Sequence, residues 1–358
     1  MLTLNLGFDR GNDRTNVATI PEGTSAFLEI DVSSMIAEGD IRRYQMIQSG
    51  SGGADLLATN ELTVEYEESV YFLADFASQG NNPTTGFGDK NRYHGNHTKI
   101  ALMAYSAMIA TRMVPNTREA VATIVMGVPF QAYQQQKEKI VSELTGSYTY
   151  SFKGRPFTLH VDSIRVFMEG AGAAIYQGFE EDATIGIVDS GSLTTNILRF
   201  DGAKAHTEVC TSFEVGSIGK VLYRLNKRFE EKYERELDDI ERQKILRASL
   251  GGIPYPELHA DGGRVDIEDL RMWIIEAIAA TGSDKNAQIS RLWGSQSGKT
   301  ASSFKKVLHV GGGSYYFHKS LQQIITFAKC PLEPEKANSR GFAVLANQIA
   351  QRKARIRA

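Results

Sequence analysis

Residues 4–12 read Leu-Asn-Leu-Gly-Phe-Asp-Arg-Gly-Asn, and residues 185–192 read Ile-Gly-Ile-Val-Asp-Ser-Gly-Ser. In both stretches an apolar run ends in Asp, any residue, Gly and a small polar residue, and a second apolar run follows. The pattern predicts a β-hairpin whose tight turn carries one carboxylate and a bare backbone. Because the hairpin recurs near the start of each half, we expect an α/β protein of two similar lobes.

Composition limits the classes of protein that fit. The chain has 358 residues, of which 42% are hydrophobic, and this favours two domains with real cores. The formal net charge is −2, whereas domains that bind nucleic acid directly are usually strongly basic. Two cysteines are too few for a disulfide framework, and neither a signal peptide nor a membrane-spanning apolar run is apparent. We therefore expect a cytoplasmic protein without a membrane span and without direct contact to nucleic acid.

Strand and helix patterns alternate along the chain and suggest three parts. Lobe I is predicted at 1–165, with a strand-rich insertion at about 21–80 and a mobile glycine-rich loop at 49–53. Lobe II is predicted at 166–337, and residues 338–358 are expected to form a helix that packs back on lobe I. The patterns predict strands at 120–128, 205–211 and 306–310 and helices at 97–113, 131–144, 267–280 and 317–328.

The two hairpin turns contain the residue types that suit a magnesium nucleotide. Glycine lets the backbone approach phosphate closely, and successive N–H groups of a turn bind anions. A carboxylate beside phosphate repels it unless a cation lies between them, so Asp9 and Asp189 suit Mg²⁺ bound through water. The predicted phosphate-binding residues are Gly11, Asn12 and Thr15 in the first turn and Gly191, Ser192, Thr194 and Thr195 in the second.

Two further segments support the hypothesis of a nucleotide site, and a third resembles one but does not fit. Hydrolysis requires a water molecule oriented toward the terminal phosphate, and Glu169, at the start of a small-residue helix, is the candidate catalytic residue. Residues 294–300 resemble a phosphate-binding P-loop, but three residues separate the glycines where the motif has four, which favours a polar loop. The candidate nucleoside pocket lies between a predicted strand and a helix and consists of Gly311, Gly312, Gly313 and Ser314.

Together these segments resemble the actin superfamily of ATPases, and within it the plasmid-segregation branch typified by ParM. Residues 8–12 resemble the first phosphate loop, 188–195 the second, and 310–314 the adenosine motif. Residues 125–130 and the Ala-Asn-x-x-Gly sequence at 337–341 resemble other ParM-like segments. The resemblance implies the two-lobed actin-like fold, a duplicated ribonuclease H-like fold with a nucleotide cleft between the lobes.

The resemblance also implies an activity and partners. It implies a Mg²⁺-dependent ATP hydrolase, with GTP as an alternative nucleotide, that polymerises head to tail on binding ATP and disassembles after hydrolysis. Such filaments segregate plasmids or position DNA through a separate DNA-binding adaptor protein. The resemblance places Glu169 as the water-orienting residue and Lys220 and Arg224 near the nucleoside. The insertion and the basic C-terminal helix are candidate surfaces for contacts with other subunits or a partner.

Two positions depart from the family pattern. The family usually carries Lys seven residues after the first-loop Asp, where this chain has Asn16, and Arg10 and Arg14 are the candidate replacements. The last polar position of the second loop, often Asp, is Asn196. These departures predict weaker metal dependence or slower turnover.

Two other functions are compatible with the same residues. A small-molecule kinase of the same superfold, such as a sugar kinase, would use Asp as a base toward a substrate hydroxyl, although no additional Asp-rich substrate loop stands out. A nucleotide-binding scaffold with little hydrolysis is the second alternative, and Asn16 leaves it open.

Overall fold

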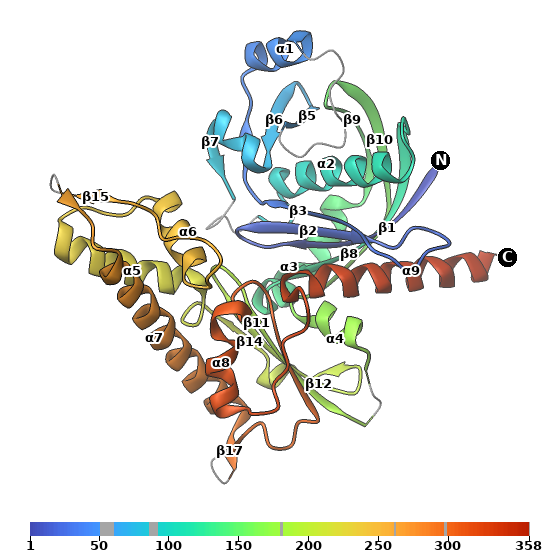
Figure 1. Ribbon diagram of the computed structural model, residues 1–358. Helices are drawn as coiled ribbons and strands as arrows, with labels where there is room; N and C mark the ends of the chain where they lie inside the picture. The colour runs from blue at the N-terminus through green and yellow to red at the C-terminus, as the bar shows by residue number, and fades with distance from the viewer. Residues whose placement is uncertain (51–60, 86–91, 180–181, 261–262, 297–298, 358) are drawn as a thin grey trace. The chain divides into compact units, whose positions relative to one another are not determined.

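The structure is a computed structural model that describes residues 1–50, 61–85, 92–179, 182–260, 263–296 and 299–357. The chain divides into unit 1, formed by Met1–Gly178 and Lys336–Ala358, and unit 2, formed by Phe179–Glu335 (Figure 1). This division differs from the boundary expected at 165/166, because helix α4 (Ala171–Gln177) packs against α9 (Ala337–Arg357) within unit 1. Most of the loop expected at 49–53 lies outside the described residues.

Unit 1 is built on one mixed sheet. Its strands are β1 (Leu2–Arg10), β2 (Arg14–Thr19), β3 (Leu28–Ser33), β4 (Ile36–Glu38), β5 (Leu62–Tyr66), β6 (Ser69–Leu73), β7 (Asn81–Thr84), β8 (Glu119–Val128), β9 (Gly146–Phe152) and β10 (Arg155–Met168), in the order β3-β2-β1-β8-β10-β9-β5-β6-β4-β7. The central strands β1, β8 and β10 are parallel, and β1 forms the expected hairpin with β2. β8 is an almost uninterrupted apolar run, as is typical of a parallel strand covered on both faces.

Two helices cover opposite faces of the centre of this sheet (Figure 1). Helix α2 (Asn96–Met113) is buried at every position from Ile100 to Thr111, and the ring centroids of Tyr105 and Phe8 lie 6.4 Å apart. Helix α9 lies against the other face, where a Cβ on Gly7 would be 2.0 Å from the carbonyl oxygen of Ser339. Neighbouring residues of a strand point to opposite faces, so Phe8 faces α2 whereas position 7 faces α9. Helix α3 (Phe130–Leu144) packs on β10.

The insertion contains a helix that the strand pattern did not predict. Residues 41–50 form α1 (Ile41–Gly50). Asp40 explains the difference, because its Oδ1 accepts hydrogen bonds from the backbone N–H groups of Arg42 (2.7 Å) and Arg43 (3.1 Å) and so caps the first turn. The buried side chain of Tyr44 then packs the helix against β6. A local cap and one aromatic anchor therefore override the alternating pattern.

Unit 2 has a smaller sheet. Its strands are β11 (Thr184–Ser190), β12 (Thr195–Asp201), β13 (Lys204–Ala205), β14 (Thr211–Phe213) and β19 (Lys306–Val310), in the order β13-β12-β11-β19 with β14 paired to β12. The expected second hairpin is formed by β11 and β12, and β11 is parallel to β19. The remaining elements are α5 (Ile218–Tyr233), α6 (Asp239–Ala248), α7 (Ile267–Trp293), α8 (Ser314–Ile324) and two small hairpins, β15–β16 (His259–Ala260 and Gly263–Arg264) and β17–β18 (Ser295–Gln296 and Lys299–Thr300).

The single strand predicted at 205–211 is wrong. β13 ends at Ala205, Thr207–Val209 form a 3-10 turn, and β14 begins at Thr211. The backbone N–H of Val209 donates to the carbonyl oxygen of His206 at 3.1 Å, and this local bond turns the chain between the two short strands. The alternating side chains of the segment gave no sign of this turn.

Helix α7 extends to Trp293, whereas its apolar pattern predicts an end at residue 280. The second half of the helix is buried through polar residues: Thr281 and Lys285 are fully buried, and Asn286 is 7% exposed. Asn286 Nδ2, for example, donates to the carbonyl oxygen of Ser320 at 2.8 Å. The second half of α7 is thus buried through polar side chains, so the spacing of apolar residues could not show where the helix ends.

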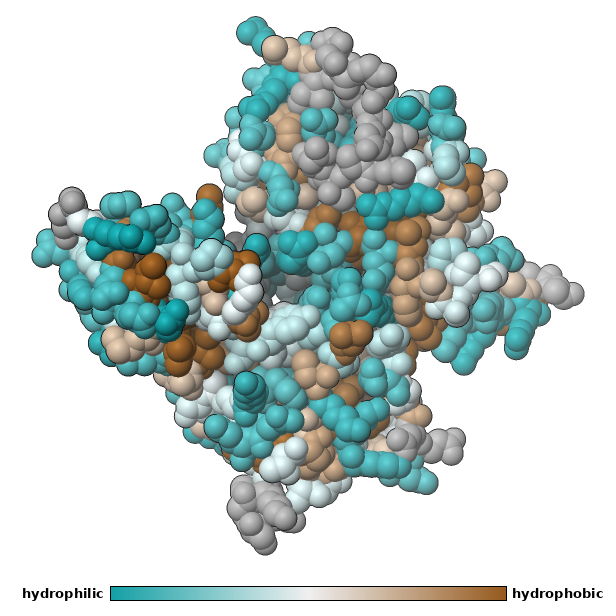
Figure 2. Space-filling view, in the orientation of Figure 1, coloured by the Kyte–Doolittle hydropathy of each residue, from teal (hydrophilic) through white to brown (hydrophobic). Residues whose placement is uncertain are grey.

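The surface is mostly hydrophilic on the face shown in Figure 2, and its apolar residues form small separate areas. Two exposed apolar residues, Ile41 and Met46, lie on α1 and are 52% and 73% exposed. Across the described parts of the chain, each helix is too short or too polar to cross a bilayer.

Helices α4 and α9 cross at a contact that requires glycine. A Cβ on Gly341 would lie 1.7 Å from the carbonyl oxygen of Gly172, and a Cβ on Gly172 would lie 2.3 Å from the carbonyl oxygen of Asn338. Backbone meets backbone here, so an added methyl group fits only if a helix moves. The Gly of the Ala-Asn-x-x-Gly sequence is therefore a packing requirement of unit 1.

Replacing Gly341 with Ala is expected to destabilise unit 1 by about 3 kcal/mol, because the methyl group would overlap Gly172 and force the two helices apart. Urea unfolding followed by circular dichroism measures the change. Gln351→Ala, at an exposed position of the same helix, is the matched control and should alter stability by less than about 0.5 kcal/mol. Equal stability of the two variants would contradict the packing role.

Candidate functional site

The carboxyl ends of β1, β8 and β10 bring two predicted site residues together in unit 1. Asp9 lies opposite Gly127 in the β1–β8 pair, and Gly127 lies opposite Phe167 in the β8–β10 pair. Glu169 follows β10, and its backbone N–H donates to the carbonyl oxygen of Val128 at 2.8 Å. A Cβ on Gly127 would be 2.7 Å from the Phe342 ring and 3.5 Å from Glu169 Cγ, so the glycine lets Phe342 of α9 pack against this edge beside Glu169. Carboxyl edges of parallel strands are the usual ligand sites of α/β sheets.

Two hydroxyl groups, those of Ser34 and Thr15, stabilise the turn that joins β1 to β2 through hydrogen bonds. Ser34 Oγ donates to the carbonyl oxygen of Gly11 at 2.8 Å, and Thr15 Oγ1 lies 2.8 Å from Ser34 Oγ. Thr15 is fully buried, so its hydroxyl supports the turn within the protein. Asn12 Oδ1 has no hydrogen-bond partner among the residues described. Of the three residues predicted to bind phosphate in this turn, Gly11 and Asn12 are partly exposed, whereas the Thr15 hydroxyl is used to support the turn.

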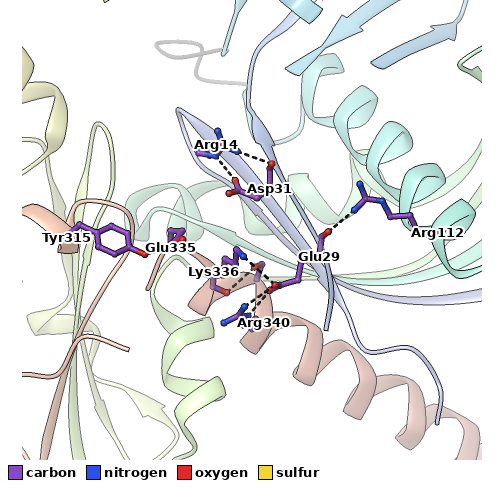
Figure 3. Close-up of polar contacts among 9 residues, drawn as sticks. Arg14, Glu29, Asp31, Arg112, Tyr315, Glu335, Lys336 and Arg340 are labelled. Carbon is purple, nitrogen blue, oxygen red and sulfur yellow. Dashed lines mark hydrogen bonds and ion pairs between the residues drawn. The ribbon is translucent and has the colours of Figure 1, made fainter. Parts of the chain in front are cut away.

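The two candidate replacements for the missing lysine differ in their surroundings. Asn16 is buried and lies opposite Asp9 in the hairpin. Arg14 is already paired, because its Nε lies 2.5 Å from Asp31 Oδ1 and its Nη2 donates to the Asp31 carbonyl oxygen at 2.9 Å (Figure 3). Arg10, in contrast, is buried and forms no such ion pair within the described ranges. Arg10 is therefore the more available of the two cations.

The start of α9 fixes the segment that carries Glu169. Asn338 Oδ1 accepts hydrogen bonds from the backbone N–H groups of Gly170 (3.0 Å) and Ala173 (3.3 Å), so a residue of α9 caps α4. Gly170 has a φ of 92°, a left-handed conformation that favours glycine. The Asn of the Ala-Asn-x-x-Gly sequence is thus a positioning residue for the segment after β10. The sequence identified this motif but not its role.

A charged cluster anchors the same part of α9 to β3 (Figure 3). Arg340 donates to both carboxylate oxygens of Glu29, from Nε at 2.7 Å and from Nη2 at 3.0 Å, and Lys336 Nζ lies 3.7 Å from the same carboxylate. Arg112 donates to the backbone carbonyl oxygen of Glu29 at 2.9 Å. Glu29 therefore ties α9 and α2 to one edge of the β2–β3 pair.

Unit 2 repeats the arrangement at the carboxyl ends of β11 and β19. Asp189 lies opposite Val310 in this parallel pair. Gly311 has a φ of 78°, and a Cβ on it would lie 2.4 Å from Asp189 Oδ1, so the glycine is required for the close approach. The backbone N–H of Gly313 donates to the carbonyl oxygen of Ser190 at 2.8 Å. The structure thus brings Asp189 together with Gly311, Gly312, Gly313 and Ser314, of which Gly312 is exposed and Ser314 is buried at the start of α8.

The turn between β11 and β12 packs against the start of α5. Gly219 donates its N–H to the carbonyl oxygen of Ser192 at 2.6 Å, and Gly191 donates to the carbonyl oxygen of Thr194 at 2.8 Å. Thr195 is fully buried, and its Oγ1 donates to the Gly216 carbonyl oxygen at 3.0 Å. Thr195, like Thr15, therefore supports its turn from within, whereas Gly191, Ser192 and Thr194 remain partly exposed.

The two residues predicted near the nucleoside lie farther along α5. Lys220 Nζ lies 4.7 Å from the ring centroid of Tyr223. Arg224 is bound to α7, with Nη2 2.6 Å from Asp284 Oδ2 and Nη1 3.3 Å from Thr281 Oγ1. Arg224 also lines a cavity of about 290 Å³ between α5 and α7. Any contact of Arg224 with a ligand would compete with this ion pair.

A buried polar cluster behind the second turn was missed by the sequence analysis. Ser190 Oγ lies 2.9 Å from His309 Nε2, and Lys285 Nζ lies 3.2 Å from His309 Nε2 and 3.5 Å from Ser190 Oγ. All three residues are fully buried, and Lys285 Nζ lies 4.4 Å from the ring centroid of Phe317. Burial lowers the pKa of Lys285 well below its usual value. Burial, Lys285 and His318 likewise lower the pKa of His309. His309, which stands between the apolar residues Leu308 and Val310 of β19, was the available signal.

Protonation of His309 is expected to destabilise unit 2 below neutral pH. Because the folded-state pKa of His309 lies below the usual 6.5, the unfolded chain binds a proton that the folded chain excludes. This contribution to stability is therefore present above pH 6.5 and is lost as the pH falls through that value. Chemical unfolding between about pH 7 and pH 5 measures the slope.

The matched variants are His309→Gln, which places a neutral hydrogen-bonding amide near Ser190, and His259→Gln, at an exposed histidine of the same unit. The first should flatten the pH dependence of the free energy of unfolding, and the second should leave it unchanged. A wild-type slope in His309→Gln would show that other groups cause the effect.

Comparisons with known proteins identify the fold. Residues 9–172 match the family model of actin-like protein N-terminal domains. A search of curated proteins gives no significant match. Among solved structures, a 15-stranded ParM filament from Clostridium botulinum has a TM-score of 0.72 at 19% identity, with 97% of this chain and 100% of that chain covered.

Two further structures agree. An archaeal actin homologue, Ta0583, has a TM-score of 0.70 at 17% identity, with 97% and 100% of the two chains covered. ParM of Bacillus thuringiensis with ATP has a TM-score of 0.66 at 15% identity, with 98% and 100% covered. The chain therefore has the fold of the ParM structures, and its residues 9–172 match the N-terminal domain of actin-like proteins.

Proposed function

We propose that the protein is an actin-like ATPase that forms filaments when ATP is bound and disassembles them after hydrolysis. The observation that carries the proposal is the repeated construction of the two units. In each unit, neighbouring parallel strands end at one edge with a single aspartate, Asp9 or Asp189, followed by a glycine turn. Such edges bind phosphate-containing ligands in many α/β proteins. Similar ParM structures include one with ATP and one in a filament, and both support the proposal.

The residues present fit a hydrated magnesium ion. In the described parts of the chain, no three His, Cys, Asp or Glu side chains gather in a group that could hold a metal. Mg²⁺ usually keeps several waters and is bound through one or two carboxylates plus phosphate oxygens, which suits Asp9 and Asp189. When bound, the ion neutralises charge on the phosphates. The glycine turns that contain Gly11 and Gly191 would each offer backbone N–H donors to phosphate.

Glu169 is the proposed catalytic residue. It lies at the same sheet edge as Asp9 and is held by backbone bonds on both sides: its own N–H is bonded to β8, and that of Gly170 to Asn338. These bonds fix the backbone at Glu169, from which the carboxylate could accept a hydrogen bond from water and orient it toward a terminal phosphate. In the same proposal, Gly311 to Ser314 receive the nucleoside, with Lys220 and Arg224 nearby.

The proposed filament forms by head-to-tail contacts between copies of the chain. Exposed apolar residues of α1, in the insertion, are a candidate contact surface, and the basic C-terminal helix is another. We also propose that the filament moves or positions DNA through a separate adaptor protein, because the net charge of −2 does not favour direct binding of DNA.

Asp189→Asn is expected to weaken binding of Mg²⁺–ATP by about 10- to 100-fold, because an amide keeps the shape of the side chain but removes its charge. Titration with a fluorescent ATP analogue in the presence of Mg²⁺ measures the affinity. Asp201→Asn changes the same charge at the opposite end of the β11–β12 hairpin and should bind as the wild type does. Wild-type affinity in Asp189→Asn would remove this residue from the site.

Light scattering and sedimentation with ATP and Mg²⁺ test the function as a whole. The wild type should polymerise on addition of ATP, and the signal should decay as phosphate appears. Glu169→Gln should lower the hydrolysis rate by about 100-fold while filaments persist, because general acid–base groups contribute about 10²–10⁴ in rate. Glu138→Gln, at an exposed position of α3, is the control.

The alternatives predict different outcomes in this experiment. Phosphate transfer to an added sugar without any rise in scattering would favour a small-molecule kinase. Polymerisation or tight nucleotide binding without phosphate release would favour a scaffold with little hydrolysis. Rapid hydrolysis by Glu169→Gln would leave the ATPase proposal intact but exclude Glu169 as the catalytic residue.

A further inference from the structure

Two buried arginines lie near the carboxyl edge of the unit 1 sheet. Arg10 is the last residue of β1 and is 1% exposed. Arg92 precedes α2 and is 7% exposed. Arginine side chains are almost never buried to this extent unless a counter-charge is present. Their surroundings therefore require an explanation.

The protein satisfies only part of the hydrogen-bonding capacity of these groups. Arg10 Nη2 donates to the carbonyl oxygen of Thr85 at 3.1 Å, but Arg10 Nε and Nη1 have no partner among the described residues. Arg92 Nη2 donates to the Arg10 carbonyl oxygen at 3.4 Å, and its guanidinium lies 4.8 Å from the ring centroid of Tyr93. Arg92 Nε is also without a partner in the described part of the chain. Three buried guanidinium nitrogens, which together carry four N–H bonds, are thus left to donate among the described residues.

Among the described residues, the charges of the pair are also unbalanced. Within the described ranges, neither Arg10 nor Arg92 forms an ion pair with a carboxylate. Burial and the neighbouring Arg92 lower the pKa of Arg10 to about 10, so the two like charges are close enough to repel each other. Two buried cations without a counter-charge are strongly unfavourable. An anion would remove both the charge imbalance and the unmet hydrogen bonds.

The position of the pair connects it with the candidate site. Tyr93 is influenced by both arginines and also by Glu169: burial and the Glu169 carboxylate raise the pKa of Tyr93, while the arginines oppose this. The arginine pair and the proposed water-orienting carboxylate are therefore neighbours of the same tyrosine. Arg10 also follows Asp9 directly, on the face of β1 that carries Phe8 and meets α2.

We propose that Arg10 and Arg92 form a buried phosphate-binding site. A tetrahedral oxyanion can accept hydrogen bonds from Nε and Nη1 of Arg10 and from Nε of Arg92, and the planar fork of arginine suits such an acceptor. Phosphate can come from two sources, the terminal phosphate of a bound nucleotide or inorganic phosphate left by hydrolysis. The nucleotide source rests on the proposed function, whereas binding of inorganic phosphate does not. The pair would supply the charge that Asn16 lacks.

Inorganic phosphate is the first probe. Phosphate, compared with chloride at equal ionic strength and in the absence of nucleotide, is expected to raise the melting temperature of the wild type by about 2–4 °C. Arg10→Met removes one of the two proposed phosphate-binding side chains together with an uncompensated charge. The variant should therefore fold, but phosphate should no longer raise its melting temperature. Arg14→Met, at the exposed arginine paired with Asp31 in the same hairpin, should keep it. An equal response of Arg10→Met and wild type, or no response of the wild type, would overturn the proposal.

Arg92→Met gives a second, independent variant should Arg10→Met fail to fold. It should also lose the phosphate response, because both guanidinium groups donate to the same ion. Isothermal titration of phosphate into each folded variant gives the binding loss directly, at about tenfold or more in Kd for each arginine removed. Unchanged Kd in Arg92→Met would exclude it from the site.

Nucleotide titrations distinguish the two sources. If the site holds the terminal phosphate, Arg10→Met should lower affinity for ATP about tenfold more than affinity for ADP. If it holds phosphate after hydrolysis, the ATP and ADP affinities should change equally, and a phosphate sensor should record faster release. A protein that binds no nucleotide would refute the proposed function while the phosphate titration still decides the arginine site. Normal nucleotide binding with a wild-type phosphate response in both variants would refute the arginine site alone.

Discussion

The geometry of unit 1 depends on the contact between the start of the last helix and the helix that follows β10. Asn338 Oδ1 bonds to the N–H groups of Gly170 and Ala173, and Gly341 lets the backbones meet. Asn338 acts 168 residues away in sequence from Gly170. Because β10 is in register with β8, and β8 with β1, the contact also determines where Glu169 stands relative to Asp9. A motif near the C-terminus thus constrains the N-terminal hairpin.

The two units support the carboxyl edges of their sheets by different interactions. In unit 1, the contact of α4 with α9 rests on close backbone packing, which involves no titratable group. In unit 2, the corresponding turn rests on Ser190, His309 and Lys285, which are buried groups with hydrogen bonds between them. Burial lowers the pKa values of both His309 and Lys285, so the stability of this cluster falls as the pH falls and the unfolded chain binds protons that the folded chain disfavours. The support of the second turn is therefore the more sensitive to solution conditions.

Much of this fold was predictable because its main signals are local. The Asp-x-Gly hairpins follow from turn chemistry, and the buried strand β8 follows from an apolar run. The features that the sequence did not predict, the end of α7 and helix α1, share a physical cause. The end of α7 depends on polar residues whose burial is compensated by distant partners, such as Lys285 with Ser190, 95 residues apart. Helix α1 depends on a single cap at Asp40 within an alternating pattern. The candidate site residues could be named from sequence, but the supporting roles of Thr15 and Thr195 required the structure.

Because Asn16 replaces the usual lysine, positive charge must approach the candidate site from a different face of the β1–β2 hairpin. Paired residues of a hairpin share a face, so a lysine at position 16 would lie beside Asp9, within about 4.5–5.5 Å between Cβ atoms, and would neutralise it directly. An asparagine there cannot neutralise Asp9. Arg10 extends from the opposite face, toward α2, so its charge can act on a phosphate without pairing with that carboxylate. In the proposed function, this separation leaves Asp9 for the hydrated cation and assigns the phosphate to the arginines, so the two charges would be balanced by different parts of the ligand.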